Sequence, residues 1–286
     1  MLVVKTVVEL QQFLSSFKHQ PVGFVPTMGA LHQGHLSLIE KAIAENDIVV
    51  VSIFVNPTQF NNKEDLEKYP RHTEKDIALI NDSFNNYQNM VVFLPDVKEV
   101  YPHPVKKSYD FGNLSLVMEA QHRPGHFDGV GMVLERFFEM IHPTKAYFGE
   151  KDFQQLAVVR NLVKQLKLNI EIIGCPIIRE INGLAMSSRN ERLKLDQKEQ
   201  AANIYRFLQE IQHQHKSLSV DKVKQNFIAA IKTIPALELE YFEITDGNTL
   251  LSINDWEETS YCVAFVAVFI GGVRLIDNIT LYRENL

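Results

Sequence analysis

The sequence predicts an α/β protein, with a Rossmann-like doubly wound parallel sheet followed by a second, smaller α+β C-terminal domain. From Pro21 to about Arg179, short apolar β-branched runs alternate with amphipathic helical stretches, as expected of a parallel sheet covered by helices on both faces. After Ile178 a polar stretch interrupts this alternation, and two helical patterns then precede the last strand patterns. We therefore expect a Rossmann-like domain over residues 1–176 and a smaller domain over residues 177–286.

Local patterns justify the elements of the first domain in turn. Val22–Val25 is typical of a strand and Ile48–Val55 of a fully buried strand. Leu36–Asn46 between them has its apolar residues at helical spacing, which completes a βαβ unit. Thr73 followed three residues later by Asp76 indicates a capping box at a helix start. Further strands are expected at 91–95, 146–149 and 170–178, and further helices at 129–141 and 153–166.

The second domain is expected to begin with two amphipathic helices, at 197–214 and 220–233. Strand patterns follow at 239–245 and 261–270. Gly271 and Gly272 then separate the second of these strands from another at 273–276, and a Gly-Gly pair between apolar runs predicts a β-hairpin.

Composition excludes several classes of protein. The 286 residues can bury a sizeable core, and the net charge of -6, from 29 Lys and Arg against 35 Asp and Glu, argues against an extended grip on nucleic acid. No apolar run reaches membrane-spanning length and the N-terminus lacks the pattern of a cleavable signal, so we expect a cytoplasmic protein with no membrane partner. Cys175 and Cys262 lie in separate apolar runs, which predicts buried thiols rather than a disulfide.

The first strand-to-helix connection, VPTMGALHQGHLSLI, is the strongest functional signal. It lies where a doubly wound sheet binds phosphate at a helix N-terminus, and Gly29 and Gly34 allow the backbone to approach a ligand closely. The P-loop and G-x-G-x-x-G patterns are absent, which leaves an H-x-G-H pair, His32 and His35, as donors to phosphate. Packing, capping or a zinc site completed by His126 are the alternatives, and nothing resembles H-E-x-x-H.

Polar residues also follow other predicted strands or precede a predicted helix. Asn56 and Gln59 in FVNPTQF carry neutral amides that could bind hydroxyl or phosphate groups, or could satisfy each other in a proline turn. Arg123 in RPGHFDGV could clamp an anion or cap its own loop. In GEKDFQQL, Lys151 suits phosphate and Asp152 suits ribose hydroxyls, whereas a solvated helix start is the plain alternative.

Another polar segment lies in the loop after Ile178. MSSR, residues 186–189, gathers two hydroxyls and a guanidinium at consecutive positions, although serine-rich loops are usually exposed linkers. Together with the first connection, FVNPTQF, GEKDFQQL and MSSR make four such segments, three of them directly after predicted strands, which favours one nucleotide site over chance.

Taken together, these motifs resemble the pantothenate synthetase family (pantoate beta-alanine ligases), within the H-x-G-H nucleotidyltransferases that include class I aminoacyl-tRNA synthetases. The resemblance rests on VPTMGALHQGH, FVNPTQF, YPR, RPGHFDGV, AYFGEKDFQQL, GLAMSSRN and RLIDNI, and spans nearly the whole chain. It implies an ATP-dependent ligase that joins (R)-pantoate to beta-alanine through pantoyl adenylate, releasing pyrophosphate and AMP. Asn61 and the helix GMVLERFFEM depart from the family pattern.

The resemblance also implies roles for the domains and for individual residues. The first domain would bind nucleotide and pantoate, and the second would act as a lid. His35 would be the proton donor, with His32, Lys151 and Arg189 as the other catalytic residues. ATP would contact Met28, Gly29, Ala30, Leu31, His32, Gln33, Gly34, His35, Gly149, Glu150, Lys151, Asp152, Ile178, Met186, Ser187, Ser188 and Arg189.

The same resemblance places the other ligands. Gln59 would bind pantoate and beta-alanine, and Gln155 would bind pantoate, with Asn56 and Arg123 nearby. The family also implies Mg²⁺ carried mainly by phosphates, with Asp76 as a candidate ligand, and a homodimer.

Two other functions compete with this ligase. A different H-x-G-H nucleotidyltransferase would act on a phosphorylated acceptor, and it would be favoured if Gln59 and Gln155 lay far from the nucleotide segments. A non-catalytic nucleotide sensor would keep the fold but would be expected to lack His35 or Lys151, both of which are present.

Overall fold

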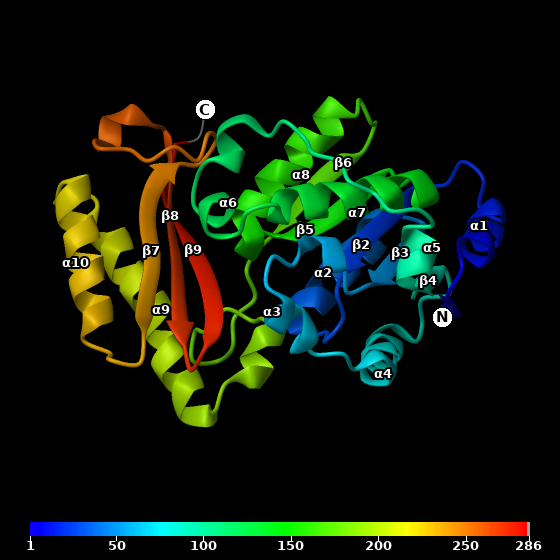
Figure 1. Cartoon of the computed structure of the whole chain (residues 1–286), viewed down its shortest axis with the longest axis horizontal. Coiled ribbons are helices and arrows are strands. Elements are labelled where there is room, and N and C mark those ends of the chain that lie inside the picture. Colours follow the sequence, from blue (N-terminus) through cyan, green and yellow to red (C-terminus); the bar gives the residue numbers. More distant parts are fainter. Residues whose placement is uncertain (285–286) are drawn as a thin grey trace. The chain divides into compact units, whose positions relative to one another are not determined.

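A computed structural model describes residues 1–284 of the chain (Figure 1). The chain forms two compact units. The N-terminal unit contains residues 1–111, 123–150 and 155–176, and the C-terminal unit contains, of the described residues, 112–122, 151–154 and 177–284. The main division therefore falls between residues 176 and 177, and two short segments that precede it in the sequence belong to the C-terminal unit.

The N-terminal unit is built on a six-stranded parallel sheet in the order β1-β4-β3-β2-β5-β6. Its strands are β1 (Leu2–Val4), β2 (Val22–Thr27), β3 (Ile48–Ile53), β4 (Met90–Phe93), β5 (Lys145–Gly149) and β6 (Glu171–Cys175). Its helices are α1 (Val7–Ser15), α2 (Gln33–Glu45), α3 (Lys63–Glu67), α4 (Thr73–Phe84), α5 (Val97–Val100), α7 (His126–Ile141) and α8 (Phe153–Gln165), whose first two residues count with the other unit.

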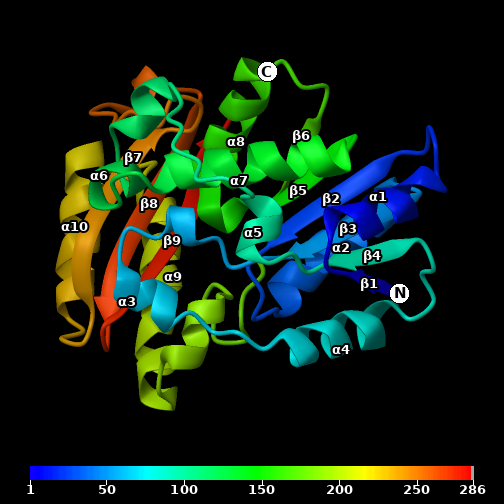
Figure 2. The same cartoon turned by 45° about the vertical axis from the view of Figure 1, so that its right-hand side comes forward.

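Helices cover both faces of this sheet. Successive residues of each strand point to opposite sides, so the sheet has apolar side chains that pack against helices on both faces. On one face, apolar residues of α2 and α4 pack with alternate strand residues such as Val25, Val51 and Val92. On the other face, Phe137 of α7 makes edge-to-face contacts with Phe24 of β2 and with Phe93 of β4. Figure 2 shows α4 and α7 on opposite sides of the sheet. The Rossmann-like fold class predicted from the sequence is confirmed.

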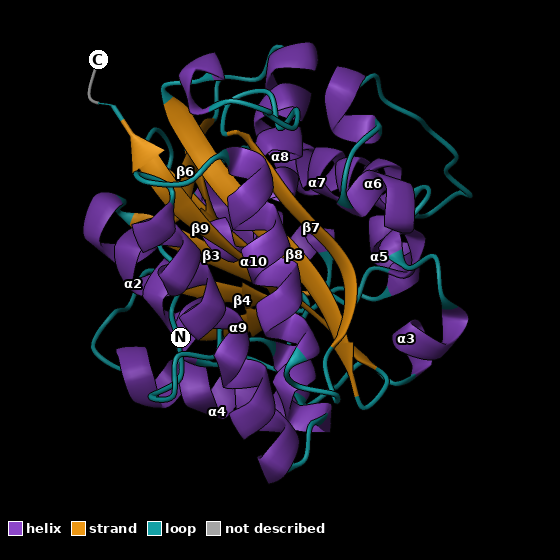
Figure 3. Cartoon of the chain, turned by 90° about the vertical axis from the view of Figure 1, so that its left-hand side faces the viewer, coloured by secondary structure: helices purple, strands orange, loops and turns teal. Residues whose placement is uncertain are grey.

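The C-terminal unit contains a three-stranded antiparallel sheet, β7-β8-β9, with its main helices on one face (Figure 3). Its elements are α6 (Glu119–His122), α9 (Leu195–Gln214), α10 (Val220–Lys232), β7 (Glu238–Asp246), β8 (Tyr261–Ile270) and β9 (Val273–Arg283). Apolar residues of α9 and α10 pack against alternate residues of β8, including Ala264, Val266 and Val268. The predicted hairpin between β8 and β9 is confirmed, with Gly271 and Gly272 at φ of 56° and 75°.

Some local expectations differ from the structure. The capping box predicted at Thr73 and Asp76 is wrong. Thr73 is the first residue of α4 and His72 precedes it without a side-chain cap, whereas the Asp76 carboxylate accepts a backbone N–H of the loop before α2. Strand β9 runs far beyond residue 276, and β1 and α1 were not predicted. Both cysteines are buried free thiols, as expected. Within residues 1–284, no helix is long and apolar enough to span a membrane.

Candidate active site

The predicted nucleotide segments of the N-terminal unit lie where the strand order reverses. From β2 the chain proceeds to β3 on one side, whereas β5 pairs with β2 on the other side. Ligands of doubly wound sheets bind at the carboxyl ends of the two strands that flank such a switch point. Met28 directly follows β2, and Gly149 is the last residue of β5. The topology thus brings these two predicted ATP-binding positions to one point of the sheet.

His32 and His35 form a reciprocal cap at the start of α2. The Nδ1 atom of His32 accepts the backbone N–H of Gly34 at 3.1 Å, and the Nδ1 atom of His35 accepts the backbone N–H of His32 at 3.3 Å. The two rings lie 4.1 Å apart between centroids. A ring nitrogen that accepts an N–H bears no proton, so each neutral imidazole carries its proton on Nε2. Capping, one of the plain alternatives, therefore coexists with the predicted role of Nε2–H as donor.

The loop before these histidines has an unusual backbone that a buried carboxylate stabilises. Gly29 and Ala30 have φ of 82° and 49°, and the second value is unfavourable for a residue with a side chain. Asp76 is 3% exposed, and its carboxylate accepts the backbone N–H of Ala30 at 2.9 Å and of Leu31 at 2.7 Å. A β-carbon at Gly29 would lie 3.0 Å from the same carboxylate. Asp76 therefore fixes the shape of the loop that leads into α2.

These contacts bear on the magnesium ligand expected at Asp76. Both of its carboxylate oxygens hold backbone N–H groups, which assigns Asp76 to loop structure before any metal. Among residues 1–284, no three or more His, Cys, Asp or Glu side chains form a group that could hold a metal ion. Mg²⁺ bound mainly through substrate phosphates requires few protein ligands. The assignment of Asp76 as a magnesium ligand stays a prediction, and the geometry favours its structural role.

Asn56 holds the turn that follows β3. It caps the short 3-10 helix η1 (Pro57–Gln59), and its Oδ1 atom accepts from the Thr58 and Tyr101 hydroxyls. Its Nδ2 atom donates to the Gly129 carbonyl at 3.1 Å and to Gln59 Oε1 at 3.1 Å. Burial raises the pKa of Tyr101, so its hydroxyl remains a donor. The proline turn with satisfied amides, the plain alternative for Asn56, is therefore present, and direct substrate contact by Asn56 stays a prediction.

Gln59 is oriented by three neighbours and reaches the nucleotide loop. Asn56 fixes its Oε1, so its Nε2 faces Met28 and donates to that sulfur at 3.1 Å. Buried His126 binds the Gln59 backbone carbonyl through Nδ1 at 2.8 Å. At Gly129 a β-carbon would lie 2.3 Å from the Thr58 carbonyl oxygen, so only glycine allows α7 to approach η1 this closely. His126 and Gly129 thus position Gln59, and RPGHFDGV is the sequence signal for both.

The other predicted residues of the N-terminal unit are placed as follows. Arg123 is half-buried, and its carbonyl accepts the backbone N–H of His126 at 3.1 Å. Gln155 is half-buried in the first turn of α8. A β-carbon added at Gly149 would have no atom of the described residues within 4 Å beyond its chain neighbours, which leaves space for a ligand, and Glu150 follows it. Ligand binding by these four residues stays a prediction.

The remaining ATP-binding candidates belong to the C-terminal unit. The carbonyl of Ile178 accepts the backbone N–H of Met186 at 3.0 Å, which closes a loop whose ends also pair at Arg179 and Ala185. Ser187 then caps a 3-10 helix, η4 (Ser188–Arg192), by accepting the Arg189 N–H at 3.3 Å. The structure therefore brings together, in one loop, the predicted residues Ile178, Met186, Ser187, Ser188 and Arg189.

Lys151 and Asp152 also belong to the C-terminal unit, although only Glu150 separates them from the end of β5. Lys151 is half-buried and Asp152 is exposed. The Lys151 backbone carbonyl accepts a hydrogen bond from the Asn278 side chain at 3.0 Å. Sequence patterns do not reveal this contact.

Comparisons with known proteins agree with this architecture. Residues 2–280 match the family model of pantoate-beta-alanine ligase. The pantothenate synthetase of Azobacteroides pseudotrichonymphae is 50% identical over 97% of this chain and 99% of its own, and that of Bacteroides fragilis is 47% identical over all of both chains.

Solved structures agree as well. Pantothenate synthetase from Thermus thermophilus superposes with a TM-score of 0.91 at 40% identity, covering 99% of this chain and all of the other. Pantoate-beta-alanine ligase from Francisella tularensis, solved with beta-gamma ATP and beta-alanine, has a TM-score of 0.81 at 35% identity and 98% coverage of both chains. The resemblance inferred from the motifs is thereby confirmed: this chain belongs to the pantoate-beta-alanine ligase family.

Proposed function

We propose that this enzyme condenses (R)-pantoate with beta-alanine in two steps at the carboxyl ends of β2, β3 and β5. The single observation that carries this choice is the hydrogen bond from Gln59 to Met28, since it joins the predicted acid-binding amide to the H-x-G-H loop. Family membership supplies the reaction class.

In the first step, a carboxylate oxygen of pantoate attacks the α-phosphorus of ATP. The bond from that phosphorus to the bridging oxygen breaks, and pyrophosphate leaves with the electron pair. In the second step, the amine nitrogen of beta-alanine attacks the acyl carbon of the adenylate, AMP leaves, and the nitrogen loses a proton. The products are pantothenate, AMP and pyrophosphate.

The chain's side chains have distinct parts in these steps. Because His32 and His35 each keep the proton on Nε2, they donate to phosphate oxygens as negative charge builds there, and His35 is the main donor. Lys151 and Arg189 supply the positive charge that stabilises the departing pyrophosphate. Gln59 binds pantoate without adding a charge that would pair with its nucleophilic carboxylate, and also receives beta-alanine.

Other substrate contacts complete the proposal. Gln155, Asn56 and Arg123 lie around pantoate, and ATP contacts Met28 to His35, Gly149 to Asp152, Ile178 and Met186 to Arg189. The space beside Gly149 supports close approach of the nucleotide. Mg²⁺ on the phosphates would neutralise charge during adenylate formation. A homodimer, a cytoplasmic location and a lid role for the C-terminal unit are further parts of the proposal.

The competing function is transfer of a nucleotide to a phosphorylated acceptor by another H-x-G-H enzyme. The contact between Gln59 and the nucleotide loop argues against it, because that function is favoured only if Gln59 lies far from the nucleotide segments.

The test measures pyrophosphate release from ATP, in the presence of Mg²⁺, with and without each of the other substrates. Release is expected only with pantoate, and AMP and pantothenate are expected when beta-alanine is added. His35→Ala and Lys151→Ala are expected to slow release by roughly a hundredfold or more while leaving the folded state intact by circular dichroism. Release without pantoate, or only with a phosphorylated acceptor, would overturn the proposal.

A further inference from the structure

The RLIDNI motif near the C-terminus forms part of β9 and has no role in the steps above. Side chains two or four positions apart on a strand share a face, whereas neighbours point to opposite faces. Arg274 and Asn278 therefore lie on one face of the C-terminal sheet, and Asp277 lies on the other. Asp277 and Asn278 are only 5% and 6% exposed. Three polar side chains on a mostly buried strand require partners.

The partner of Asn278 is the segment that carries Lys151. The Asn278 Nδ2 atom donates to the Lys151 carbonyl at 3.0 Å. Two residues later, Phe153 packs edge-on against Phe265 of β8, with 5.4 Å between ring centroids. The C-terminal sheet therefore holds the segment at its backbone and at an aromatic side chain.

A buried charge network holds the far end of the same segment. Gln154 Oε1 accepts the backbone N–H of Glu119 at 3.0 Å, and its Nε2 donates to the carbonyls of Leu114 and Val117 at 2.9 Å each. The Glu119 carboxylate receives two hydrogen bonds from Arg274, both at 2.8 Å.

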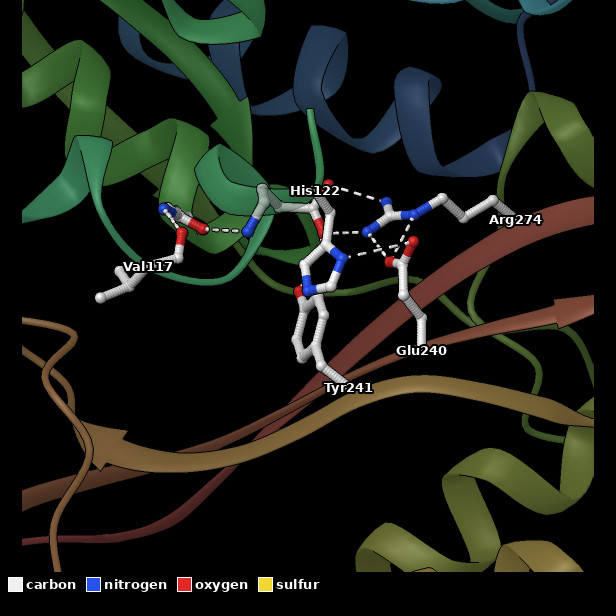
Figure 4. A network of polar contacts seen from close by, with 7 residues as sticks. Val117, His122, Glu240, Tyr241 and Arg274 are labelled. Carbon is white, nitrogen blue, oxygen red and sulfur yellow. Dashed lines mark hydrogen bonds and ion pairs between the residues drawn. The ribbon is translucent and has the colours of Figure 1, made fainter. Parts of the chain in front are cut away.

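Figure 4 shows how closely this network is packed. Arg274 also donates to Glu240 at 2.8 Å, the Tyr241 hydroxyl donates to Glu119 at 2.8 Å, and the His122 ring stacks on Tyr241. These carboxylates raise the pKa of Arg274, which stays charged. Gln154 is thus attached through Glu119 to β9, the strand that also holds Lys151.

Asp277 makes the equivalent attachment on the opposite face. Its carboxylate accepts two hydrogen bonds from Arg179, at 2.7 and 3.0 Å, and the Arg179 guanidinium lies 3.6 Å from the ring centroid of Tyr205 in α9. Arg179 also donates to the Gly183 carbonyl at 3.2 Å. Adjacent residues of β9 therefore hold both nucleotide segments of the C-terminal unit: residues 151–154 and the loop from 178 to 189.

We propose that the RLIDNI strand positions these two segments for adenylate formation, with Asn278 as the positioning residue for Lys151. This inference rests on the proposed function. Lys151 follows β5 of the parallel sheet in sequence, yet its backbone is attached to the C-terminal sheet. The Lys151 ammonium must meet the negative charge that develops on the phosphates. Adenylate formation therefore slows steeply when the backbone of this lysine shifts.

The test is a double-mutant cycle read by pantoate-dependent pyrophosphate release. Asn278→Ala is expected to lower kcat roughly tenfold or more, with little change in the KM for pantoate. In a Lys151→Ala background the same substitution should change kcat by less than about twofold, because a residue that acts through Lys151 has nothing left to position. Gln212→Ala is the matched control, since that amide also binds a β9 carbonyl, Thr280, and it should keep the wild-type rate.

Hydrogen exchange provides a readout that does not depend on turnover. Peptides covering residues 149–156 should exchange faster in Asn278→Ala, while those covering α2 should not change. Multiplicative losses in the double variant, or unchanged exchange at 149–156, would overturn the positioning role and leave the proposed function standing. A wild-type rate for Lys151→Ala would instead overturn the catalytic role of Lys151 itself.

Discussion

Replacing Asp76 with asparagine is expected to destabilise the loop that carries His32 and His35. The asparagine side chain has nearly the same shape, but only one of its two terminal atoms can accept a hydrogen bond. One of the two backbone N–H groups now bound by Asp76, at Ala30 or Leu31, would then face an NH₂ group in a buried site.

The magnitude follows from these contacts. A hydrogen bond to a charged group contributes about 1.5–3 kcal/mol, and leaving a buried donor without an acceptor costs about 1–3 kcal/mol. These two figures describe overlapping effects, so we expect Asp76→Asn to lower the free energy of unfolding by about 2–4 kcal/mol. The strained backbone of Ala30 adds to the reasons for loop rearrangement, so adenylate formation should also slow.

Urea unfolding followed by circular dichroism measures this effect, in the absence of nucleotide and Mg²⁺. Asp82→Asn is the matched control, since Asp82 is exposed on the same helix, and its effect should stay within about 0.5 kcal/mol. Equal stability of the two variants would refute the structural role of Asp76. If the variant were also active but required more Mg²⁺, the carboxylate would instead be a magnesium ligand.

Three further predictions follow from glycine packing and from buried thiols. Gly129→Ala should raise the KM for pantoate and lower the melting temperature, because the added carbon would collide with backbone and displace Gln59; unchanged values would contradict the close approach. Gly149→Ala should raise the KM for ATP without lowering the melting temperature, because the described residues leave that space open; a KM equal to wild type would refute nucleotide contact there. Burial raises the pKa of the Cys175 thiol to about 11 and of the Cys262 thiol to about 12, so both thiols stay protonated at neutral pH. Both should therefore resist alkylation by iodoacetamide until urea unfolds the chain, and rapid labelling of the native enzyme would contradict this.

The sequence predicts the sheet and most of its helices because their apolar periodicities are long and regular. Strand β1 was missed because three residues, Leu2–Val4, are too few to establish a period. The extension of β9 was missed for a different reason: Asp277 and Asn278 are polar in a buried strand, and their partners, Arg179 and Lys151, lie far earlier in the chain.

The site shows the same limit. Motif spacing identifies His32 and His35, but the role of Asp76 depends on contacts with backbone groups 45 and 46 positions away. Its place three residues after Thr73 resembles a capping box, and only the tertiary structure shows that the carboxylate is used by another loop. Local patterns therefore locate candidate side chains, and long-range contacts decide what they do.

If the pantoate carboxylate attacks the α-phosphorus of ATP, one of its oxygens must be transferred to AMP, and an isotope label follows that oxygen. Pantoate labelled with oxygen-18 in its carboxylate is incubated with the enzyme, ATP, Mg²⁺ and beta-alanine, and the products are analysed by mass spectrometry. Because the bridging oxygen of the adenylate leaves with AMP, one labelled oxygen should appear in AMP and one should stay in the amide carbonyl of pantothenate. Label in inorganic phosphate, or AMP without label, would show that the pantoate carboxylate does not attack the α-phosphorus.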